Sequence, residues 1–287
     1  MHFVVTGTDG FAAGHIAEGL VGLGHRVSAV SRRPQPREIT NCAIFRADLK
    51  HGTGDLPDDP DVIVHAAAQS HPVGPSIMDY VEDNVLATAE ICAYARRTGA
   101  RGIIFLSSIS VFGTVSTPTL DEATACVDPD NYGLSKLLCE RLLAEVAETV
   151  PSISLRLPGI VGDGAGNVWL AEVVRKFRAG GDVVIYNPDA PFNNVVHVSD
   201  LVPFVETLAL ARLSGAEILV LGADRPISIA RVVDLAKRHC RSASAVTIDD
   251  SVVRMPFTLD CGRAKSQFGY RPKSTERIVE LASSEIH

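Results

Sequence analysis

Hydrophobic residues follow two different spacings, which alternate along the first half of the chain. Short runs rich in valine, isoleucine and phenylalanine are separated by longer stretches in which apolar residues recur every three or four positions. The runs predict six strands, near residues 2–6, 26–31, 42–46, 61–66, 101–107 and 152–157. The periodic stretches predict helices, most clearly near 11–23, 79–98 and 132–148. Strands that alternate with helices indicate βαβ units and a parallel sheet covered on both faces.

Beyond residue 157 the pattern loosens into Gly- and Pro-rich loops and shorter elements. Helices are predicted near 167–179, 199–212, 228–240 and 274–284, and strands near 183–186 and 217–221. A chain of 287 residues also fits two folding units, at about 150 residues each. We therefore expect an α/β fold with a Rossmann-type, doubly wound parallel sheet in residues 1–157. A smaller C-terminal α/β lobe, residues 158–287, is expected to pack on it.

Composition and charge narrow the classes of function. Hydrophobic residues make up 46% of the chain and charged residues 21%, which indicates a globular protein and excludes a mostly disordered one. Acidic residues outnumber basic ones by 34 to 27 without any basic block, so neither nucleic acid nor an anionic membrane is an expected partner. No apolar run reaches the roughly 20 residues that span a bilayer, and no signal peptide is recognisable. Six scattered cysteines predict reduced thiols rather than a metal site, and hence a cytoplasmic protein.

A glycine-rich turn follows the first predicted strand. Residues 6–14 read TGTDGFAAG and lead directly into the first predicted helix. Glycines at this place let the chain turn tightly and let backbone N–H groups reach a pyrophosphate at the positive end of the helix. The position favours a dinucleotide site over an ordinary loop. The cofactor contacts expected from this turn are Gly7, Asp9, Gly10, Phe11 and Ala12.

The residues after the second strand indicate which dinucleotide is bound. An acidic residue about 20 positions after the glycines usually holds the adenosine ribose of NAD, whereas this chain has Arg32 and Arg33 after Ser31. Two guanidinium groups suit a 2′-phosphate, so NADP(H) is favoured and NAD(H) is the alternative. One or both arginines could instead be solvated loop charges, and this less favoured alternative stays open. Further cofactor contacts are expected from Asp48, Leu49, Ala66, Ala67 and Ala68.

Tyr132 and Lys136 stand four residues apart on a predicted helix, so their side chains share one face. A nearby ammonium favours the phenolate, and lowering a tyrosine pKa from about 10 toward 7 corresponds to roughly 4 kcal/mol. Such a tyrosine can exchange a proton with a substrate hydroxyl or carbonyl. The same spacing also fits an amphipathic helix with a solvated lysine. Ser107 and Ser108 end the fifth strand at the sheet edge where ligands bind, so one hydroxyl can reach the reacting oxygen.

Several spaced motifs together resemble an extended short-chain dehydrogenase/reductase of the NAD(P)-dependent epimerase/dehydratase group. The glycine turn, the segment 107–113 (SSISVFG) and the Tyr132/Lys136 pair follow the family order of T-G-x-x-G-x-x-G, S-S-x-x-V-Y-G and Y-x-x-x-K. The likeness covers almost the whole chain and includes the segments 131–136 (NYGLSK), 155–162 (LRLPGIVG), 196–200 (VHVSD) and 259–265 (LDCGRAK).

The resemblance implies roles for individual residues. Ser108 matches the catalytic serine, Tyr132 the acid/base residue, and Lys136 the partner that also holds the nicotinamide ribose. Pro158 and Ile160 match the stretch that lines the carboxamide. Ser107 is expected beside the cofactor. The resemblance also implies a homodimer through the helices predicted at 79–98 and 132–148.

The chain departs from the family pattern where substrates bind. Asn193 stands where members acting on nucleotide-sugars have an arginine on the diphosphate, a charge-assisted contact worth about 1.5–3 kcal/mol. Phe112 replaces a tyrosine. Asn84 matches a family asparagine on the helix below the active site, although it fits equally a helix-interior residue bonded to backbone. The substrate contacts expected from the sequence are Ser70, His71, Ser108, Asn167, Asn193 and Arg254.

Three functions follow from these residues. The paired arginines favour an NADPH-dependent ketoreductase that passes hydride between nicotinamide and a sugar-like alcohol or ketone, with Tyr132 moving the proton. The overall likeness supports an alternative, a nucleotide-sugar 4-epimerase with tightly bound NAD. A catalytically silent dinucleotide-binding protein is the third, and the intact set Ser108, Tyr132 and Lys136 argues against it.

Overall fold

The computed structural model describes residues 1–70, 76–251 and 255–287, so the expected contacts His71 and Arg254 lie outside the described residues. The chain forms two compact units that are each discontinuous in sequence. Unit 1 comprises residues 1–114, 125–156 and 201–219, and unit 2 comprises residues 115–124, 157–200 and 220–287. The division of the chain after residue 157 stays a prediction.

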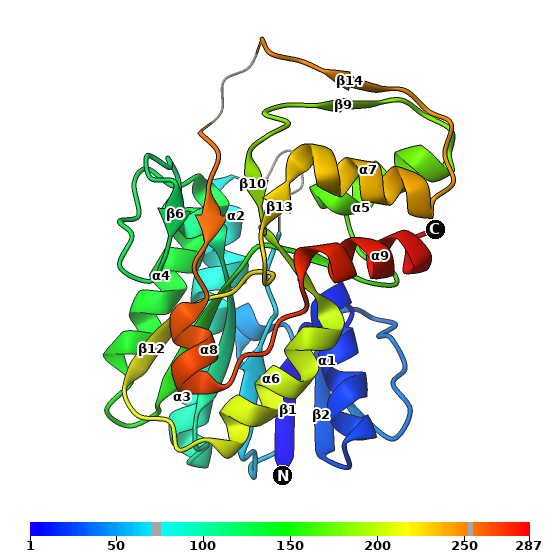
Figure 1. Cartoon of the computed structure of the whole chain (residues 1–287). Coiled ribbons are helices and arrows are strands. Elements are labelled where there is room, and N and C mark those ends of the chain that lie inside the picture. The colour runs from blue at the N-terminus through cyan, green and yellow to red at the C-terminus, as the bar shows by residue number, and fades with distance from the viewer. Residues whose placement is uncertain (71–75, 252–254) are drawn as a thin grey trace. The chain divides into compact units, whose positions relative to one another are not determined.

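Unit 1 is built on a seven-stranded sheet with the order β12-β7-β5-β4-β1-β2-β3 (Figure 1). The strands are β1 (His2–Thr6), β2 (Arg26–Ser31), β3 (Ala43–Arg46), β4 (Val62–His65), β5 (Ile103–Ser108), β7 (Ser152–Leu157) and β12 (Ala216–Val220). The pairings from β3 through β5 are all parallel. This Rossmann-type arrangement confirms the predicted fold class. The strand expected near 217–221 is β12, and it extends the central sheet.

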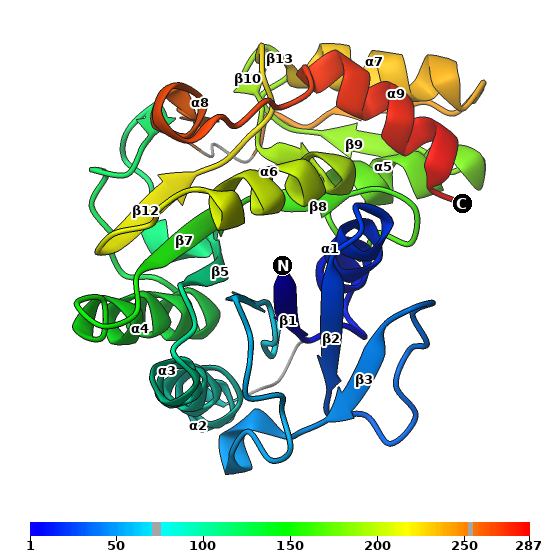
Figure 2. The same cartoon turned by 90° about the horizontal axis from the view of Figure 1, so that it is seen from below.

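Helices cover both faces of this sheet, which explains why its strands read as continuous apolar runs. Figure 2 shows α3 (Ala87–Thr98) and α4 (Asn131–Glu145) on one face, and α1 (Phe11–Gly22) and α6 (Val198–Leu210) on the other. Every residue of β1, β4 and β7 is buried. The core between the sheet and α3 and α4 includes Ile63, Ile91, Phe105 and Leu143.

The helix predicted at 79–98 is interrupted. It consists of α2 (Ile77–Tyr80), a π-helical turn η2 (Val81–Leu86) and α3. Ser76 and Asp79 form a capping box that begins the segment. A π-helical turn is a feature that often marks functional sites. Hydrophobic periodicity could not reveal this turn, because the helix keeps one buried face on both sides of it.

Unit 2 contains the remaining strands in two-stranded pairs. Its strands are β6 (Thr119–Leu120), β8 (Gly159–Val161), β9 (Val183–Ile185), β10 (Pro191–Phe192), β11 (Val195–His197), β13 (Ile227–Ser228), β14 (Val246–Ile248) and β15 (Thr258–Leu259). Its helices are α5 (Trp169–Arg178), α7 (Ile229–His239), α8 (Gly262–Phe268) and α9 (Thr275–Glu285). The bounds of α5, α7 and α9 lie within about two residues of those predicted. α8 was not predicted, because a helix of seven residues is too short to show a hydrophobic period.

Unit 1 also has two short 3₁₀ helices. η1 (Leu49–His51) follows Asp48, and η3 (Ile109–Phe112) follows Ser108.

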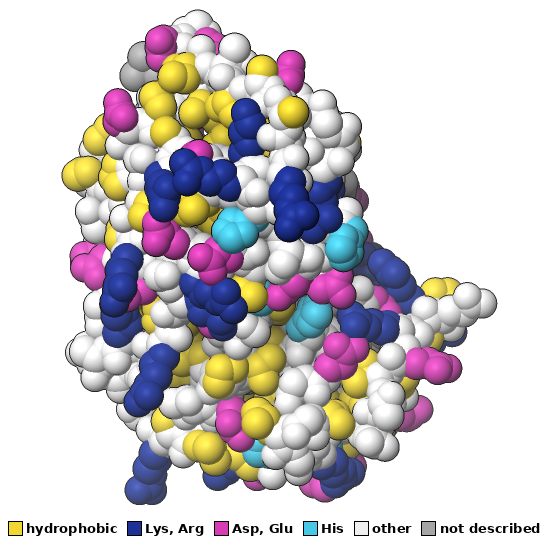
Figure 3. All heavy atoms as spheres, turned by 45° about the vertical axis from the view of Figure 1, so that its right-hand side comes forward, with side chains coloured by type: hydrophobic (Ala, Val, Ile, Leu, Met, Phe, Trp, Pro, Cys, Tyr) yellow, Lys and Arg dark blue, Asp and Glu magenta, His cyan; other side chains and the backbone are white. Residues whose placement is uncertain are grey.

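Among the described residues no helix is both long and apolar enough to cross a membrane. Figure 3 shows acidic and basic side chains interspersed on the face it displays.

Candidate active site

The glycine turn has the geometry that a bound dinucleotide needs. Gly7 has a φ of +78°, and a Cβ atom built there would lie 2.7 Å from the Cα atom of Ala67, so both conformation and space require glycine. Gly10 then begins α1, and no side chain caps this helix. The backbone at the start of α1 is therefore open to an anionic group.

A buried hydrogen-bonded chain holds this turn against β4. The Thr6 hydroxyl oxygen accepts from the backbone N–H groups of Ala66 and Ala67, at 3.2 and 3.1 Å, and pairs with Nδ1 of His65 at 2.8 Å. Nε2 of His65 pairs with the Thr88 hydroxyl at 3.0 Å. Burial, aided by the charge of Lys136, lowers the pKa of His65 to about 3, so the ring is neutral.

A cavity of about 400 Å³ opens beside the turn, within unit 1. The expected cofactor residues that line it are Gly7, Asp9, Gly10, Arg32, Arg33, Asp48, Leu49, Ala66, Ala67 and Ala68. Ser70, which the sequence analysis assigned to the substrate, lines it too. The lining residues that the sequence analysis missed are Val30, Ala47, Gln69, Asp83 and Ala87. The open helix start and the glycine cradle fit a dinucleotide, and the assignment of the pyrophosphate to Gly7 and Gly10 and of the adenine to Asp48 and Leu49 stays a prediction.

Asp9 shapes the loop that carries the two arginines. Its carboxylate accepts hydrogen bonds from the Ser31 hydroxyl and from the backbone N–H of Arg37, the latter at 2.8 Å. The Ser31 hydroxyl in turn accepts from the backbone N–H of Arg33 at 3.0 Å. Asp9 thereby holds the end of β2 and the loop after it in a defined course along the cavity.

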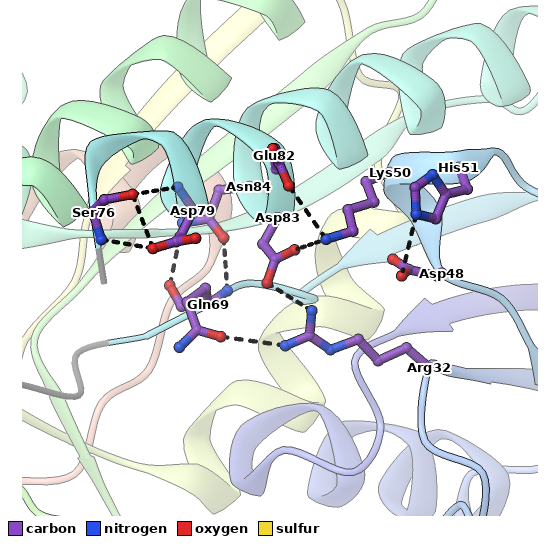
Figure 4. A network of polar contacts seen from close by, with 10 residues as sticks. All are labelled: Arg32, Asp48, Lys50, His51, Gln69, Ser76, Asp79, Glu82, Asp83 and Asn84. Atoms are coloured by element: carbon purple, nitrogen blue, oxygen red, sulfur yellow. Dashed lines mark hydrogen bonds and ion pairs between the residues drawn. The ribbon is translucent and has the colours of Figure 1, made fainter. Parts of the chain in front are cut away.

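Arg32 reaches from this loop to η2 (Figure 4). Its Nη1 atom donates to the Asp83 carboxylate at 2.7 Å and its Nη2 atom to the side-chain oxygen of Gln69 at 3.2 Å. Lys50 donates to the same carboxylate at 3.1 Å. Sequence spacing does not predict these contacts, because Arg32 and Asp83 are 51 positions apart in the chain.

Asn84, the next residue of η2, joins the cavity to α4. Its side-chain oxygen accepts from the backbone N–H of Gln69 at 2.6 Å, and its side-chain nitrogen donates to the Ser135 hydroxyl at 2.9 Å. Ser135 donates to the carbonyl oxygen of Tyr132 at 2.7 Å. The asparagine is thus bonded both to backbone and to the helix that carries the expected catalytic residues.

Ser108 and Tyr132 meet where β5 ends and α4 begins. The Ser108 hydroxyl hydrogen-bonds the Tyr132 phenol. The close approach of α4 depends on Gly133, since a Cβ atom built there would lie 2.2 Å from the carbonyl oxygen of Ser110. Burial raises the pKa of Tyr132 to about 12, although the hydrogen bond from Ser108 opposes the rise. This direction is opposite to the one expected from the Tyr132/Lys136 spacing.

Lys136 is buried, and its Nζ atom donates to the carbonyl oxygen of Leu106 at 2.7 Å. It lies 4.5 Å from the ring centroid of Phe105 and 5.9 Å from that of Tyr132. Burial lowers its pKa to about 8, while Cys139 and Glu140 act in the opposite sense. A backbone carbonyl therefore holds the ammonium near the tyrosine ring, and the burial of the phenol outweighs any lowering of its pKa by this charge.

A buried ion pair supports the same face of α4 one turn further on. Glu140 accepts two hydrogen bonds from Arg156, at 3.1 and 2.8 Å, and one from the Ser107 hydroxyl at 2.6 Å. The hydroxyl of Ser107, expected beside the cofactor, is thus committed to Glu140. The Arg156 guanidinium also lies 4.9 Å from the ring centroid of Phe112. The feature of the sequence that could have indicated this ion pair is the position of Glu140, four residues after Lys136.

Unit 2 has a cavity of its own, about 340 Å³ in volume. The aromatic residues in its lining are Trp169, Tyr186, Phe192 and Phe257, and its charged ones are Glu172 and Lys176. The rings of Trp169 and Phe192 lie 5.0 Å apart. Asn194 also lines it, and the side-chain oxygen of Asn194 is buried without a hydrogen-bond partner among the described residues.

The other expected substrate and cofactor residues of unit 2 have varied surroundings. Asn193 is buried, and its amide bonds three backbone groups, the carbonyls of Ala223 and Leu259 and the N–H of Leu259. Asn167 is exposed just before α5. Pro158 is buried, Ile160 is half-buried on β8, and their roles stay predictions. In the described part of the chain, no three His, Cys, Asp or Glu side chains gather as a metal site would require.

The sheet, the glycine turn and the serine–tyrosine contact define a dinucleotide-dependent enzyme of the Rossmann type, and comparison with known proteins agrees. The model of the NAD dependent epimerase/dehydratase family matches residues 3–222, and the chain belongs to this family. It is accordingly an NAD(P)-dependent enzyme, as the sequence predicts.

Relatives and solved structures resemble the chain over most of its length. A UDP-glucose 4-epimerase of Neisseria meningitidis serogroup C is 24% identical over 320 aligned positions, which cover 93% of this chain and 91% of the relative. A D-erythronate dehydrogenase of Haemophilus influenzae is 25% identical and covers 70% of this chain and 73% of its own. MoeE5, solved in complex with UDP-glucuronic acid and NAD, has a TM-score of 0.83 at 24% identity, covering 99% of this chain and 98% of its own. These structural likenesses support the fold.

Proposed function

We propose that the chain is a nucleotide-sugar epimerase that oxidises and re-reduces one sugar carbinol with a nicotinamide cofactor. The observation that carries the proposal is the contact between Ser108 and Tyr132 in front of the buried Lys136. Family membership and full-length similarity to UDP-glucose 4-epimerases support the same reaction. The alternative named in the sequence analysis is thus better supported than the ketoreductase.

The chemistry divides between the cofactor and the chain. When bound, the nicotinamide ring accepts a hydride from the substrate carbon or returns it. A phenolate of Tyr132 would take the hydroxyl proton of the carbinol as the hydride leaves, and the phenol would return this proton to the carbonyl oxygen as the hydride comes back. The Ser108 hydroxyl can hold the same oxygen. Burial raises the pKa of Tyr132 to about 12, so the phenol is the form present at neutral pH, and it is the phenolate that needs a nearby positive charge. The Lys136 ammonium is positive charge behind the ring, which favours the phenolate that remains.

The cavity of unit 2 is itself suited to a nucleotide, the class of ligand that the proposal requires. Aromatic side chains such as Trp169 and Phe192 suit a flat heterocycle, and such rings gain from stacking. The unpartnered side-chain oxygen of Asn194 calls for an N–H donor, which a pyrimidine base provides. Asn193 cannot replace the family arginine on a diphosphate while its amide holds three backbone groups. Lys176 is the positively charged residue among the described lining of this cavity.

A second candidate, an NADPH-dependent ketoreductase, has one specific observation in its favour. Arg32 and Arg33 line the dinucleotide cavity after β2, at the place where NAD-binding relatives of this fold usually have an acidic residue. Guanidinium groups there suit the 2′-phosphate of NADP(H). NADP(H) preference is therefore part of this second proposal, with NAD(H) as the cofactor of the first.

We also propose a homodimer. Exposed apolar side chains on the α2–α3 segment and on α4 would be covered in such an assembly; they are Ile77, Met78, Leu86, Leu134 and Leu138.

The test begins with the purified chain and UDP-glucose, with and without added NAD. We expect UDP-galactose to accumulate to a constant ratio, measured by proton NMR, with no net change in nicotinamide absorbance. The Tyr132→Phe variant should produce none. Consumption of NADPH with a keto-sugar nucleotide, and no epimer, would select the ketoreductase. Absence of both reactions in a chain that binds dinucleotide would contradict the nucleotide-sugar proposal.

A further inference from the structure

The adenosine end of the dinucleotide cavity contains a carboxylate that does not follow β2. Asp83 comes from η2, on the far side of the cavity from the arginine loop, and lines the cavity together with Arg32 and Arg33. Figure 4 shows its two oxygens turned to different cations, one to Arg32 at 2.7 Å and the other to Lys50 at 3.1 Å. A single carboxylate therefore holds two positive groups, one from the loop after β2 and one from η1.

The burial of these groups is unequal. The Asp83 side chain is 14% exposed and that of Arg32 is 50% exposed, so the carboxylate is the sheltered member of the pair. Burial raises the pKa of the Asp83 carboxyl, but hydrogen bonds from Arg32 and Lys50 and their charges lower it by more. The carboxylate is therefore charged at neutral pH. Gln69 also fixes the position of Arg32, because its side-chain oxygen accepts from the second guanidinium nitrogen at 3.2 Å.

This geometry bears on which dinucleotide the cavity accepts. A guanidinium binds phosphate through a planar fork of N–H groups, and here both terminal nitrogens of Arg32 already have acceptors. A 2′-phosphate that drew on Arg32 would have to displace Asp83 or lie beside its negative charge. A free 2′-hydroxyl carries no charge and meets no such repulsion.

We propose that Asp83 is a specificity-determining residue that competes with the 2′-phosphate of NADP(H) for Arg32 and so lets the chain accept NAD(H). The inference rests on the proposed dinucleotide cavity and refines it. It also reconciles two signals that point in opposite directions. The paired arginines indicate NADP(H), whereas the structural relatives named with a cofactor carry NAD.

The experiment measures the affinities of NADH and NADPH for the full chain by isothermal titration. We expect Asp83→Asn to raise NADPH affinity about tenfold or more, because the Arg32 guanidinium, freed from its carboxylate, can then donate charge-assisted hydrogen bonds to the 2′-phosphate. NADH affinity should change by less than about threefold. Asp83→Ser, measured alongside, guards against a defect peculiar to the asparagine, and both variants are checked for a cooperative thermal transition.

The matched control is the neighbouring Glu82. It carries the same charge and contacts the same Lys50, at 3.5 Å, but it does not line the cavity and does not contact Arg32. Glu82→Gln should leave the ratio of the two affinities within about twofold. In the Arg32→Ala background, the gain from Asp83→Asn should fall to less than about threefold, because the competing guanidinium is gone.

Three results would overturn the inference. They are an unchanged affinity ratio in both folded Asp83 variants, an equal change in Glu82→Gln, or a full gain that survives in the Arg32→Ala background. If neither dinucleotide binds the wild-type chain, the proposed cofactor cavity and this inference fail together. If both dinucleotides bind and the ratio of their affinities is the same in the Asp83 variants as in wild type, the proposed function stands and the inference alone fails.

Discussion

The Nζ atom of Lys136 donates a hydrogen bond to the carbonyl oxygen of Leu106, at 2.7 Å, inside the core of unit 1. The contact joins helix α4, which carries Tyr132, to strand β5 close to its end at Ser108. It places a positive charge behind the Tyr132 ring and fixes where the two chain segments meet. A buried ammonium is costly to the fold, and this cost leads to the first prediction.

Lys136→Met should raise the free energy of unfolding near pH 7. Burial lowers the pKa of Lys136 from 10.5 to about 8, which corresponds to about 3 kcal/mol against the charged form. Leaving the Leu106 carbonyl without its donor destabilises the fold by about 1 kcal/mol. The net increase in the free energy of unfolding should therefore be about 2 kcal/mol. Because the folded-state pKa is the lower one, the gain is complete below pH 8 and disappears as the pH rises from 8 to about 10.5.

Urea unfolding at several pH values measures this difference. Lys50→Met is the control, because the hydrogen bond from Lys50 to Asp83 raises the pKa of Lys50 and its removal should give no gain. A Lys136→Met chain that is less stable than wild type at pH 7 would contradict the assigned cost of burial.

Tyr132→Phe should lower turnover by about 10²–10⁴-fold, because the proton donor at the reacting oxygen is lost while the ring remains. Cofactor affinity should stay within about threefold. Tyr80→Phe is a close control, since its buried ring lies 6.1 Å from that of Tyr132 yet has no assigned role in proton transfer. Steady-state kinetics and titration separate the two effects. Turnover near the wild-type rate in the Tyr132 variant would remove this residue from the mechanism.

Glu140→Gln should destabilise the fold by about 3–5 kcal/mol, because it leaves the buried Arg156 charge without its partner. The double change Glu140→Gln with Arg156→Met removes both charges and should recover part of that loss. Asp234→Asn breaks the exposed i,i+4 pair with Arg238 and should change stability by less than about 0.5 kcal/mol. Chemical denaturation measures the free energy of unfolding of each variant. Equal losses in Glu140→Gln and Asp234→Asn would contradict the assigned difference between the buried and the exposed pair.

Leu134→Glu combined with Leu138→Glu should convert the proposed homodimer to a monomer. Both leucines are exposed on α4, and two charges placed in an apolar interface are costly to desolvate. Leu210→Glu, at an exposed apolar position on α6, should leave the dimer intact. Light scattering coupled to size exclusion reports the mass. A wild-type chain that elutes as a monomer at every concentration would refute the dimer itself.

The local pattern of the sequence was enough to determine the fold class and the place of the glycine turn. Strand runs such as those at residues 2–6 and 152–157 are recognisable because burial on both faces demands continuous apolar residues, and this demand acts on each short segment separately. Gly7 was recognisable for a similar reason, since a positive φ and the approach of Ala67 allow only glycine. The four-residue spacing of Tyr132 and Lys136 likewise belongs to a single helix.

Only the tertiary structure decided which of these side chains meet and with what effect. Asp83 on η2 meets Arg32 from the loop after β2, the side-chain amide of Asn193 bonds backbone groups that are distant in sequence, and Glu140 accepts the hydrogen bond of the Ser107 hydroxyl. The pKa of Tyr132 rises because burial outweighs the favourable hydrogen bond, and no spacing along one helix reports burial. Hydrophobic periodicity is a property of neighbours in the chain, whereas charge, solvent exposure and hydrogen-bond partners depend on neighbours in space.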